Sequence, residues 1–436
     1  MEELPELQAV GVLGPIARAQ LGAVLASEHI VAALRGLGAP SDDVLACAPM
    51  SMANLGSVRH APLSCAANLD LADGGEAADE LRSMESRRAG LSTLLDCTSI
   101  GAGRDPAMLR EIAHGCRRLR VILSTGHGSE RHGLPGWLRG ASEEEIAALM
   151  LRELSEGVDG TGGSGEPAVR AGAITAGVSS LPTALELKLL RAAAIASRRS
   201  LAPIFVQLAA FAEPEDGLPL QLLAELEGAG AAPSRVCFVL SGLALTLALR
   251  DVVCSPLIEA ARRGVFVCVA GLGMPDVWLP AETGAPVHLP HDGEIANAVC
   301  RLLQAGLGEQ LLLSTGVRMR LQRERYGGGG YGHCRDFFVP LLRAGGVAPD
   351  ALRALTEINA ARLLCWWKPP PPPRRSMRPW TCTWCVHVHD GPLHAHERLA
   401  EDQMFYDKGD HRYCSTACLS AHRQAGFGPT PAPGGK

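Results

Sequence analysis

The sequence predicts an α/β protein, a (β/α)8 barrel with a small zinc-binding module after it. Two observations support this fold class. Between about residues 20 and 365, eight short apolar segments alternate with segments that favour helix, and a cysteine-rich tail follows five prolines at residues 369–373. Strands that alternate with helices form parallel sheets, and eight such units close into a barrel.

The predicted strands cover residues 23–26, 92–97, 119–124, 171–175, 203–208, 235–240, 265–270 and 310–314. Several of them, such as Val-Cys-Phe-Val-Leu at residues 236–240, are apolar at every position. An uninterrupted apolar run is typical of a strand that is buried on both faces, as in a parallel sheet covered by helices.

The connecting segments carry ordinary helix signals. Ser142 and Glu145 have the spacing of a capping box, in which the hydroxyl accepts from the backbone N–H of the third helical residue. Residues 183–198 are rich in Ala, Leu, Glu, Lys and Arg, which favour helix. Arg104 and Asp105 are interpreted as a pair that anchors a loop.

Composition limits the class of protein. The chain has 436 residues, of which 47% are hydrophobic, so a large core can form. Its net charge of −5 argues against general nucleic-acid binding. The longest mostly apolar run, residues 236–249, is shorter than the roughly 20 residues of a membrane helix.

No secretory signal is visible at the acidic start of the chain, so a cytoplasmic protein is expected. Ten of the fourteen cysteines are scattered through the body of the sequence, many of them in apolar strands. We interpret them as reduced, buried thiols rather than as a disulfide framework.

The predicted organisation has four parts. A barrel covers residues 10–365, a proline-rich spacer covers 366–379, a Cys/His module covers 380–426, and a disordered tail covers 427–436. The five prolines favour an extended, semi-rigid linker.

Six segments of the barrel region resemble the phosphotriesterase-related branch of the amidohydrolase superfamily. They lie at residues 12–16, 27–30, 95–105, 156–161, 312–316 and 325–333, and their order and spacing hold across residues 10–365. The resemblance implies a TIM barrel of amidohydrolase type. It also implies two zinc-type ions at the C-terminal ends of the strands, which activate a bridging hydroxide for hydrolysis.

Most of the metal ligands that the resemblance implies are absent from this sequence. The family uses a His-x-His pair on the first strand, a carboxylate on the fourth, one His each on the fifth and sixth, and an Asp on the eighth. The matching positions are Ser27 with His29, Thr175 or Ala176, Gln207, Leu240 and Gly316. Because neutral oxygens do not offset two dications, we expect His29 to be a vestigial ligand position and the binuclear site to be absent.

Two histidines have alternative interpretations. His29 is either a leftover ligand or a buried histidine that is hydrogen-bonded to backbone, and we favour the latter. His127, in a Gly-His-Gly segment after the third strand, could act as a base, but a solvated loop histidine is the simpler interpretation.

The tail predicts one structural zinc bound by four thiolates. Its ligands are Cys382, Cys385, Cys414 and Cys418, in two pairs separated by 28 residues. Four ligands leave no open position for water. The second half resembles treble-clef fingers of the FCS/MYM/TRASH kind, and a tail histidine could replace one thiolate. The candidates are His387, His389, His411 and His422.

Three functions follow from these features. The first is a degenerate, non-hydrolytic barrel that binds a small ligand or a partner and carries a zinc adaptor. The second is an active zinc-dependent hydrolase of ester or N-acyl amide bonds. The third is an interaction protein with the barrel as scaffold. For the zinc module we expect a protein partner, since acidic residues dilute its arginines.

Overall fold

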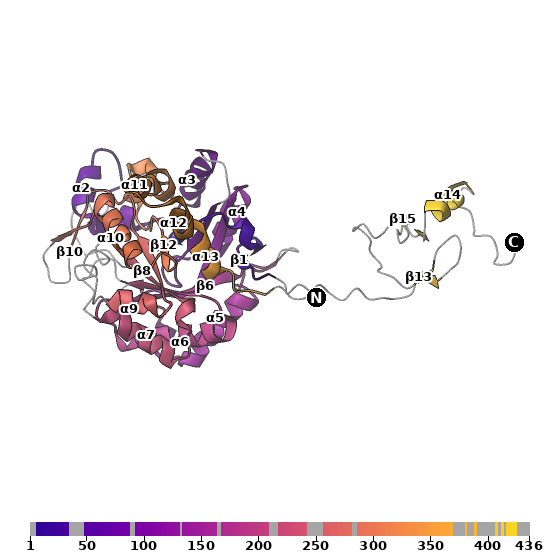
Figure 1. The fold of residues 1–436 in the computed structure, drawn as a ribbon, viewed down its shortest axis with the longest axis horizontal. Helices are drawn as coiled ribbons and strands as arrows, with labels where there is room; N and C mark the ends of the chain where they lie inside the picture. The colour runs from indigo at the N-terminus through magenta and orange to yellow at the C-terminus, as the bar shows by residue number, and fades with distance from the viewer. Residues whose placement is uncertain are drawn as a thin grey trace. The chain divides into compact units, whose positions relative to one another are not determined.

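The computed structural model describes residues 6–34, 48–87, 92–130, 133–163, 167–208, 217–241, 256–280 and 286–368. In the tail it describes residues 380–381, 388–389, 406–408, 411–413 and 416–424. The chain forms two compact units, Met1–Lys368 and Pro369–Lys436 (Figure 1).

The first unit contains one eight-stranded sheet. Its strands are β3 (Ala23–Glu28), β4 (Ser92–Asp96), β5 (Leu119–His127), β6 (Ala171–Val178), β7 (Ile204–Leu208), β8 (Val236–Ser241), β9 (Phe266–Ala270) and β12 (Leu311–Leu313). Neighbours in the sheet follow the chain order, and every neighbouring pair is parallel. The structure therefore confirms the eight predicted strands, with β3, β5 and β6 extending further than predicted.

The first and last strands meet and close the sheet into a barrel. The Ser27 backbone N–H donates to Ser314 Oγ at 2.9 Å. The His29 N–H donates to the Val317 carbonyl, also at 2.9 Å. The (β/α)8 barrel predicted from the alternation is thus present, and this contact between β3 and β12 is called the seam below.

Helices surround the barrel in the usual alternation (Figure 1). Among the described residues of this unit, the α-helices are α2 (Leu55–His60), α3 (Gly74–Arg87), α4 (Pro106–His114), α5 (Glu143–Ser155), α6 (Ala184–Ser200), α7 (Leu218–Gly228), α9 (Pro256–Arg262), α10 (Asp292–Gln304), α11 (Val339–Ala344), α12 (Pro349–Arg353) and α13 (Asn359–Leu364). Single 3-10 turns are Arg18–Gln20, Pro62–Ser64, Ala66–Leu69, Gly136–Arg139, Pro233–Arg235, Arg320–Gln322 and Glu324–Tyr326, and the π-helical segments are Cys334–Phe338 and Ala354–Ile358.

Two small hairpins lie outside the barrel sheet. β1 (Ala9–Gly11) pairs with β2 (Gly14–Ile16), and β10 (Trp278–Pro280) pairs with β11 (Pro286–His288). The second hairpin lies in the connection between β9 and α10, at the C-terminal end of the barrel strands.

The helix starts form as the sequence predicts. The Glu145 N–H donates to Ser142 Oγ while the Ser142 N–H donates to the Glu145 carboxylate, which completes the capping box. Asp105 caps α4 by accepting from the Met108 N–H. Arg104 forms a two-pronged ion pair with Glu153 at 2.7 and 2.8 Å, which confirms its anchoring role.

The strands alternate between an inner and an outer apolar layer. On β8, Cys237 and Val239 belong to the cluster inside the barrel. Phe238 and Leu240 belong to the larger cluster between strands and helices, together with Leu257 of α9. The alternation fixes which positions can face the barrel interior.

The second unit contains short elements within its described residues. They are β13 (Trp380–Thr381), β14 (Val388–His389), β15 (Tyr406–Lys408), β16 (His411–Tyr413) and α14 (Thr416–Gln424). Cys382, Cys385 and Cys414 lie outside the described residues, as does the side chain of Cys418. The four-thiolate zinc site therefore stays a prediction. Within the described part of the whole chain, no helix is both long and apolar enough to cross a membrane.

Candidate functional site

Ser27 and Gln207 meet inside the barrel near the C-terminal ends of β3 and β7. The Ser27 hydroxyl lies 3.3 Å from Gln207 Oε1 and 3.2 Å from its Nε2. The sequence comparison placed both at former ligand positions, and the structure brings them together. These two neutral groups are thus hydrogen-bonded to each other at the mouth.

Glu28, between the two positions of the expected His-x-His pair, is fully buried in the seam. Its carboxylate accepts from the Ser314 hydroxyl at 2.6 Å and the Thr315 hydroxyl at 2.7 Å. It also accepts from the Gly316 N–H at 3.0 Å and the Val317 N–H at 2.8 Å. Burial raises the pKa of Glu28, and these four bonds oppose that rise. The Glu28 carboxylate therefore joins β3 to residues 314–317 and closes the barrel.

Asp96, at the end of β4, is a second buried carboxylate, and backbone N–H groups donate hydrogen bonds to it. It accepts from the Ile30 N–H at 2.7 Å and from the Thr98 N–H at 2.8 Å. Burial raises the pKa of Asp96 to about 6. Beside it, His29 is half-buried and its Nδ1 is hydrogen-bonded to Thr98 Oγ1 at 3.1 Å. One partner of the His29 ring is therefore a side-chain hydroxyl, which the interpretation of this histidine as bonded to backbone did not include.

Of the positions matched to the family's ligands, Leu240 is wrongly placed, and Ala176 drops out of the Thr175–Ala176 alternative. Both residues lie in the outer cluster, against the helices. Val239 is the inward residue near the end of β8, and Ala173 marks the inward face of β6. Because inward residues alternate along β6, Thr175 is the inward member of the Thr175–Ala176 alternative. Its buried hydroxyl has no hydrogen-bond partner among the described residues.

Gly316 lies in the seam, where its N–H donates to the Glu28 carboxylate, and it presents no side chain to the barrel interior. Its φ is +62°, and an added Cβ would lie 2.8 Å from the Gly271 backbone nitrogen. An aspartate at this position would be strained and would collide with the neighbouring chain.

His127 is not the solvated loop histidine that the sequence suggested. It is the last residue of β5 and only 1% exposed, with its ring edge-on to Trp137 at 6.2 Å. Burial lowers the pKa of His127 to about 4, so the ring is neutral near pH 7. A buried, neutral imidazole outside the barrel interior is not placed to act as a base at the mouth.

The whole barrel region matches the phosphotriesterase family, over residues 5–364. The chain belongs to the phosphotriesterase family. A phosphotriesterase-related protein of Nematostella vectensis is 28% identical over 356 residues, which cover 80% of this chain and 95% of the relative. An N-acetyltaurine hydrolase of Salmo salar is 27% identical over 358 residues, covering 81% and 96%.

A solved structure is similar to this chain over most of its length. It is the crystal structure of a resiniferatoxin-binding protein from Rhodobacter sphaeroides. It is 30% identical, with a TM-score of 0.73, and the match covers 84% of this chain and 98% of that one. The proteins similar to this chain thus include one described as a hydrolase and one described as a binding protein.

The described residues at the mouth of this phosphotriesterase-family barrel do not fit a pair of divalent metals. The inward groups are hydroxyls, one amide and the Cys97 thiol, whose pKa burial raises above its usual range. Both nearby carboxylates, Glu28 and Asp96, are occupied by protein donors. Divalent zinc-type ions need imidazole, thiolate or carboxylate ligands, and His29 alone cannot replace them.

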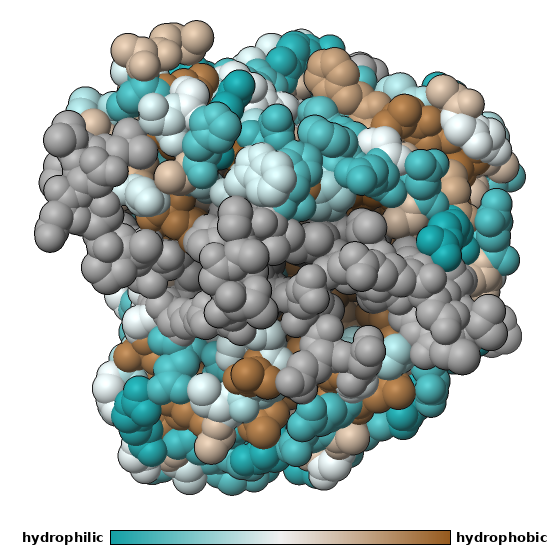
Figure 2. All heavy atoms as spheres, turned by 90° about the vertical axis from the view of Figure 1, so that its left-hand side faces the viewer, coloured by the Kyte–Doolittle hydropathy of each residue, from teal (hydrophilic) through white to brown (hydrophobic). Residues whose placement is uncertain are grey.

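A second cluster at the same end of the barrel escaped the sequence analysis. Asp276, His288 and His291 offer ligand atoms that all lie within 4.8 Å of one another. They lie on and beside the β10–β11 hairpin, seen with α2 at the left of Figure 1. Figure 2 views the domain from this side, where hydrophilic and hydrophobic side chains are interspersed over the face. The His-x-x-His spacing at residues 288–291 was the only signal in the sequence.

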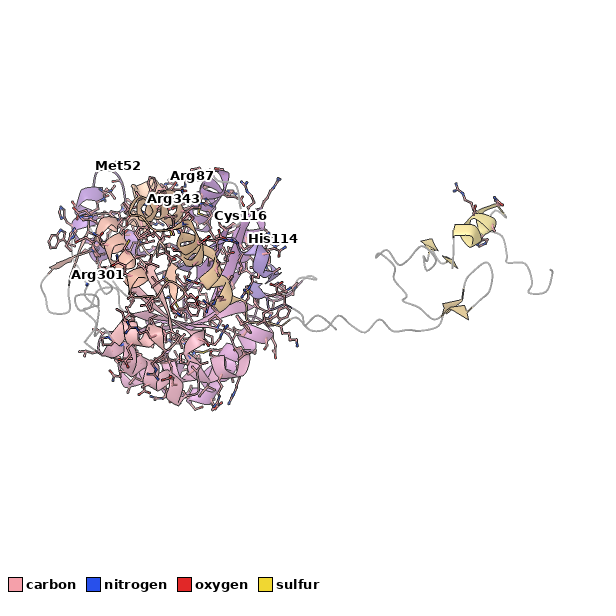
Figure 3. The ribbon with its side chains drawn as sticks, viewed as in Figure 1. Met52, Arg87, His114, Cys116, Arg301 and Arg343 are labelled. Atoms are coloured by element: carbon pink, nitrogen blue, oxygen red, sulfur yellow. The ribbon has the colours of Figure 1, made fainter. Side chains whose placement is uncertain are left out.

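The opposite end of the barrel holds a cavity of about 260 Å³. The β1–β2 hairpin and the end of α4 line it, including Arg110, His114 and Arg170. Figure 3 labels His114 on the opposite side of the domain from Met52, which precedes α2. This cavity is therefore separate from the mouth.

Proposed function

We propose that this chain is a ligand-binding member of the phosphotriesterase family whose barrel does not perform two-metal hydrolysis. The observation that carries the proposal is the Ser27–Gln207 pair, which fills two former ligand positions with neutral groups bonded to each other. Such a pair can exchange hydrogen bonds with a neutral ligand, whereas it offers no charge to a metal.

The character of the mouth favours an uncharged small molecule. Its inward surface combines the Ser27–Gln207 pair and the unpartnered Thr175 hydroxyl with apolar residues such as Val239. A mainly apolar site with a few placed polar groups is the usual composition of a small-molecule site. The similarity to a protein described as resiniferatoxin-binding supports ligand binding as the function of this chain.

A second candidate is hydrolysis of N-acyl amide or ester bonds. It is favoured by relatives described as N-acetyltaurine hydrolases, which are 24–27% identical to this chain. It would require a metal-ligand set that the described mouth residues do not supply.

Turnover measurements separate the two candidates. The purified full chain, loaded with zinc or manganese, should not hydrolyse N-acetyltaurine, a lactone or a phosphotriester above background. Metal-dependent turnover that His29→Ala abolishes would replace the binding proposal by the hydrolase. His114→Gln, at the other end of the barrel, is the matched control and should change nothing in either case.

We also propose that the tail binds one structural zinc through Cys382, Cys385, Cys414 and Cys418 and contacts a protein partner. The paired spacing supports this role. Native mass spectrometry of the full chain should show a zinc ion that Cys414→Ser removes. An unchanged zinc content in that variant would refute the site.

A further inference from the structure

The β10–β11 hairpin brings three potential metal ligands to one place. Its register sets Trp278 opposite His288. Asp276 lies in the bend just before β10, two residues from Trp278. It meets His288 of β11, and their closest atoms, Asp276 Oδ1 and His288 Nε2, lie 2.5 Å apart.

His291 completes the cluster from the start of α10. Its backbone is held there, because its N–H donates to the Glu294 carboxylate at 2.9 Å. Its side chain makes no capping hydrogen bond, so the ring is left to face the hairpin. The His288 and His291 rings have centroids 5.0 Å apart.

We propose that Asp276, His288 and His291 form a three-ligand site for a divalent transition metal of the zinc or cobalt class. Two imidazoles and a carboxylate are the donor set that such ions prefer. With metal–ligand bonds of about 2.0–2.2 Å, tetrahedral ligand atoms lie about 3.3 Å apart. On metal binding, Asp276 Oδ1 and His288 Nε2 would move slightly apart from their present 2.5 Å. The His291 ring would move closer to both of them.

The surroundings fix the ligands without blocking the site. Trp278 lies edge-on to the His288 ring at 5.0 Å, which orients that ring. Asp292, next to His291, accepts from the Gly273 N–H at 2.9 Å and is hydrogen-bonded to His333. The Asp276 side chain remains 70% exposed and that of His288 29% exposed, so an ion can enter from solvent.

Three protein ligands leave a fourth position open. Sites of this type keep water or a ligand atom there, unlike closed structural sites. His60 ends α2, which packs against β10, so this imidazole stands near the site without belonging to the group of three ligands. The site is independent of the Ser27–Gln207 pair, so it goes beyond the proposed function of the barrel mouth.

Cobalt and zinc titration of the full, metal-stripped chain tests this site. The wild type should bind one equivalent more than His288→Gln, Asp276→Asn or His291→Gln. The loss in affinity should exceed the roughly 10–100-fold that removal of an outer-shell partner costs. The cobalt spectrum of this equivalent should lack thiolate charge-transfer bands, which separates it from metal bound by tail cysteines.

His114→Gln is the matched control, because it removes an exposed histidine from the other end of the barrel. It should bind as much cobalt as the wild type, with the same affinity. If all three cluster variants also keep wild-type stoichiometry and affinity, the proposal is wrong. Retention of wild-type circular dichroism shows that a loss of binding is not a loss of fold.

Discussion

Glu28 and Asp96 at the strand ends and Asp276 on the β10–β11 hairpin are carboxylates at the same end of the barrel, yet their partners differ. Glu28 and Asp96 are buried and accept hydrogen bonds from backbone and hydroxyl groups. Asp276 is exposed and faces two imidazoles. The donors around a carboxylate, rather than its presence, decide whether it can serve a metal.

The pKa shifts of the buried carboxylates and of the exposed one are also opposite in direction. Burial raises the pKa of Glu28 and of Asp96, so proton uptake by these groups is favoured in the folded chain. The hydrogen bond with His288 lowers the pKa of Asp276, which keeps this carboxylate ionised. Ionisation is what a metal ligand requires.

The strongest test of the contrast is Glu28→Ala. It leaves three buried donors at the seam without an acceptor, the Thr315 hydroxyl and the N–H groups of Gly316 and Val317, whereas the Ser314 hydroxyl keeps the Ser27 carbonyl. At about 1–3 kcal/mol for each donor, the unfolding free energy should fall by about 3 kcal/mol or more, as measured by urea denaturation. Glu111→Ala, an exposed glutamate on α4, should stay within about 0.5 kcal/mol of the wild type. A seam variant of wild-type stability would show that Glu28 does not close the barrel.

Asp96 should make the stability of the barrel fall as pH rises. Its folded pKa of about 6 lies above the ordinary value of 3.8. Its stabilising contribution is therefore complete below about pH 4 and is lost as pH rises through 6. The shift corresponds to about 3 kcal/mol. Denaturation midpoints between pH 4 and 7.5 should show a smaller slope for Asp96→Asn, whereas Asp350→Asn, an exposed control, should keep the wild-type slope.

The Ser27–Gln207 pair should contribute less. Ser27→Ala removes a hydrogen bond between neutral groups and should cost about 1 kcal/mol. Combined with Gln207→Leu, the cost should be less than the sum of the single changes, because the two side chains are hydrogen-bonded to each other. Metal content should not change in any of these variants. A loss of bound metal in Ser27→Ala would contradict the assignment of the mouth as neutral.

The smallest effect on the metal-free fold is expected at the hairpin. His288→Gln changes a partly exposed side chain and should leave the denaturation midpoint without metal unchanged. Zinc at 100 times its dissociation constant should stabilise the wild type by about 2.7 kcal/mol, and the variant should gain none of this at the barrel transition. Equal stabilisation of both proteins would place the metal elsewhere.

The sequence predicted the strands of the barrel well, because eight apolar runs stand out between helical segments. It could not assign the faces of β8. Val236 to Leu240 is apolar throughout, so nothing in that run distinguishes Val239 from Leu240. The predicted rim position, Leu240, is therefore wrong by one residue: it lies in the outer layer, and Val239 faces inward.

The functional groups were harder to predict because they depend on contacts between distant segments. Nothing in the local sequence shows that the Glu28 carboxylate accepts hydrogen bonds from residues 314–317. The hairpin cluster likewise forms only when β10 and β11 pair, which brings Asp276 to a histidine 12 residues later. By contrast, the capping box of Ser142 and Glu145 was predictable, since all its partners are local.

The seam also affects folding during synthesis, because its two sides are far apart in the sequence. Glu28 reaches its partner Val317 across 289 residues. Until that distant segment leaves the ribosome, β3 remains an open sheet edge with a carboxylate that lacks its donors. Contacts between such remote parts of a chain form slowly, and unpaired strand edges attract other chains. Nascent chains that stop short of residue 317 are therefore the form of this protein most exposed to aggregation.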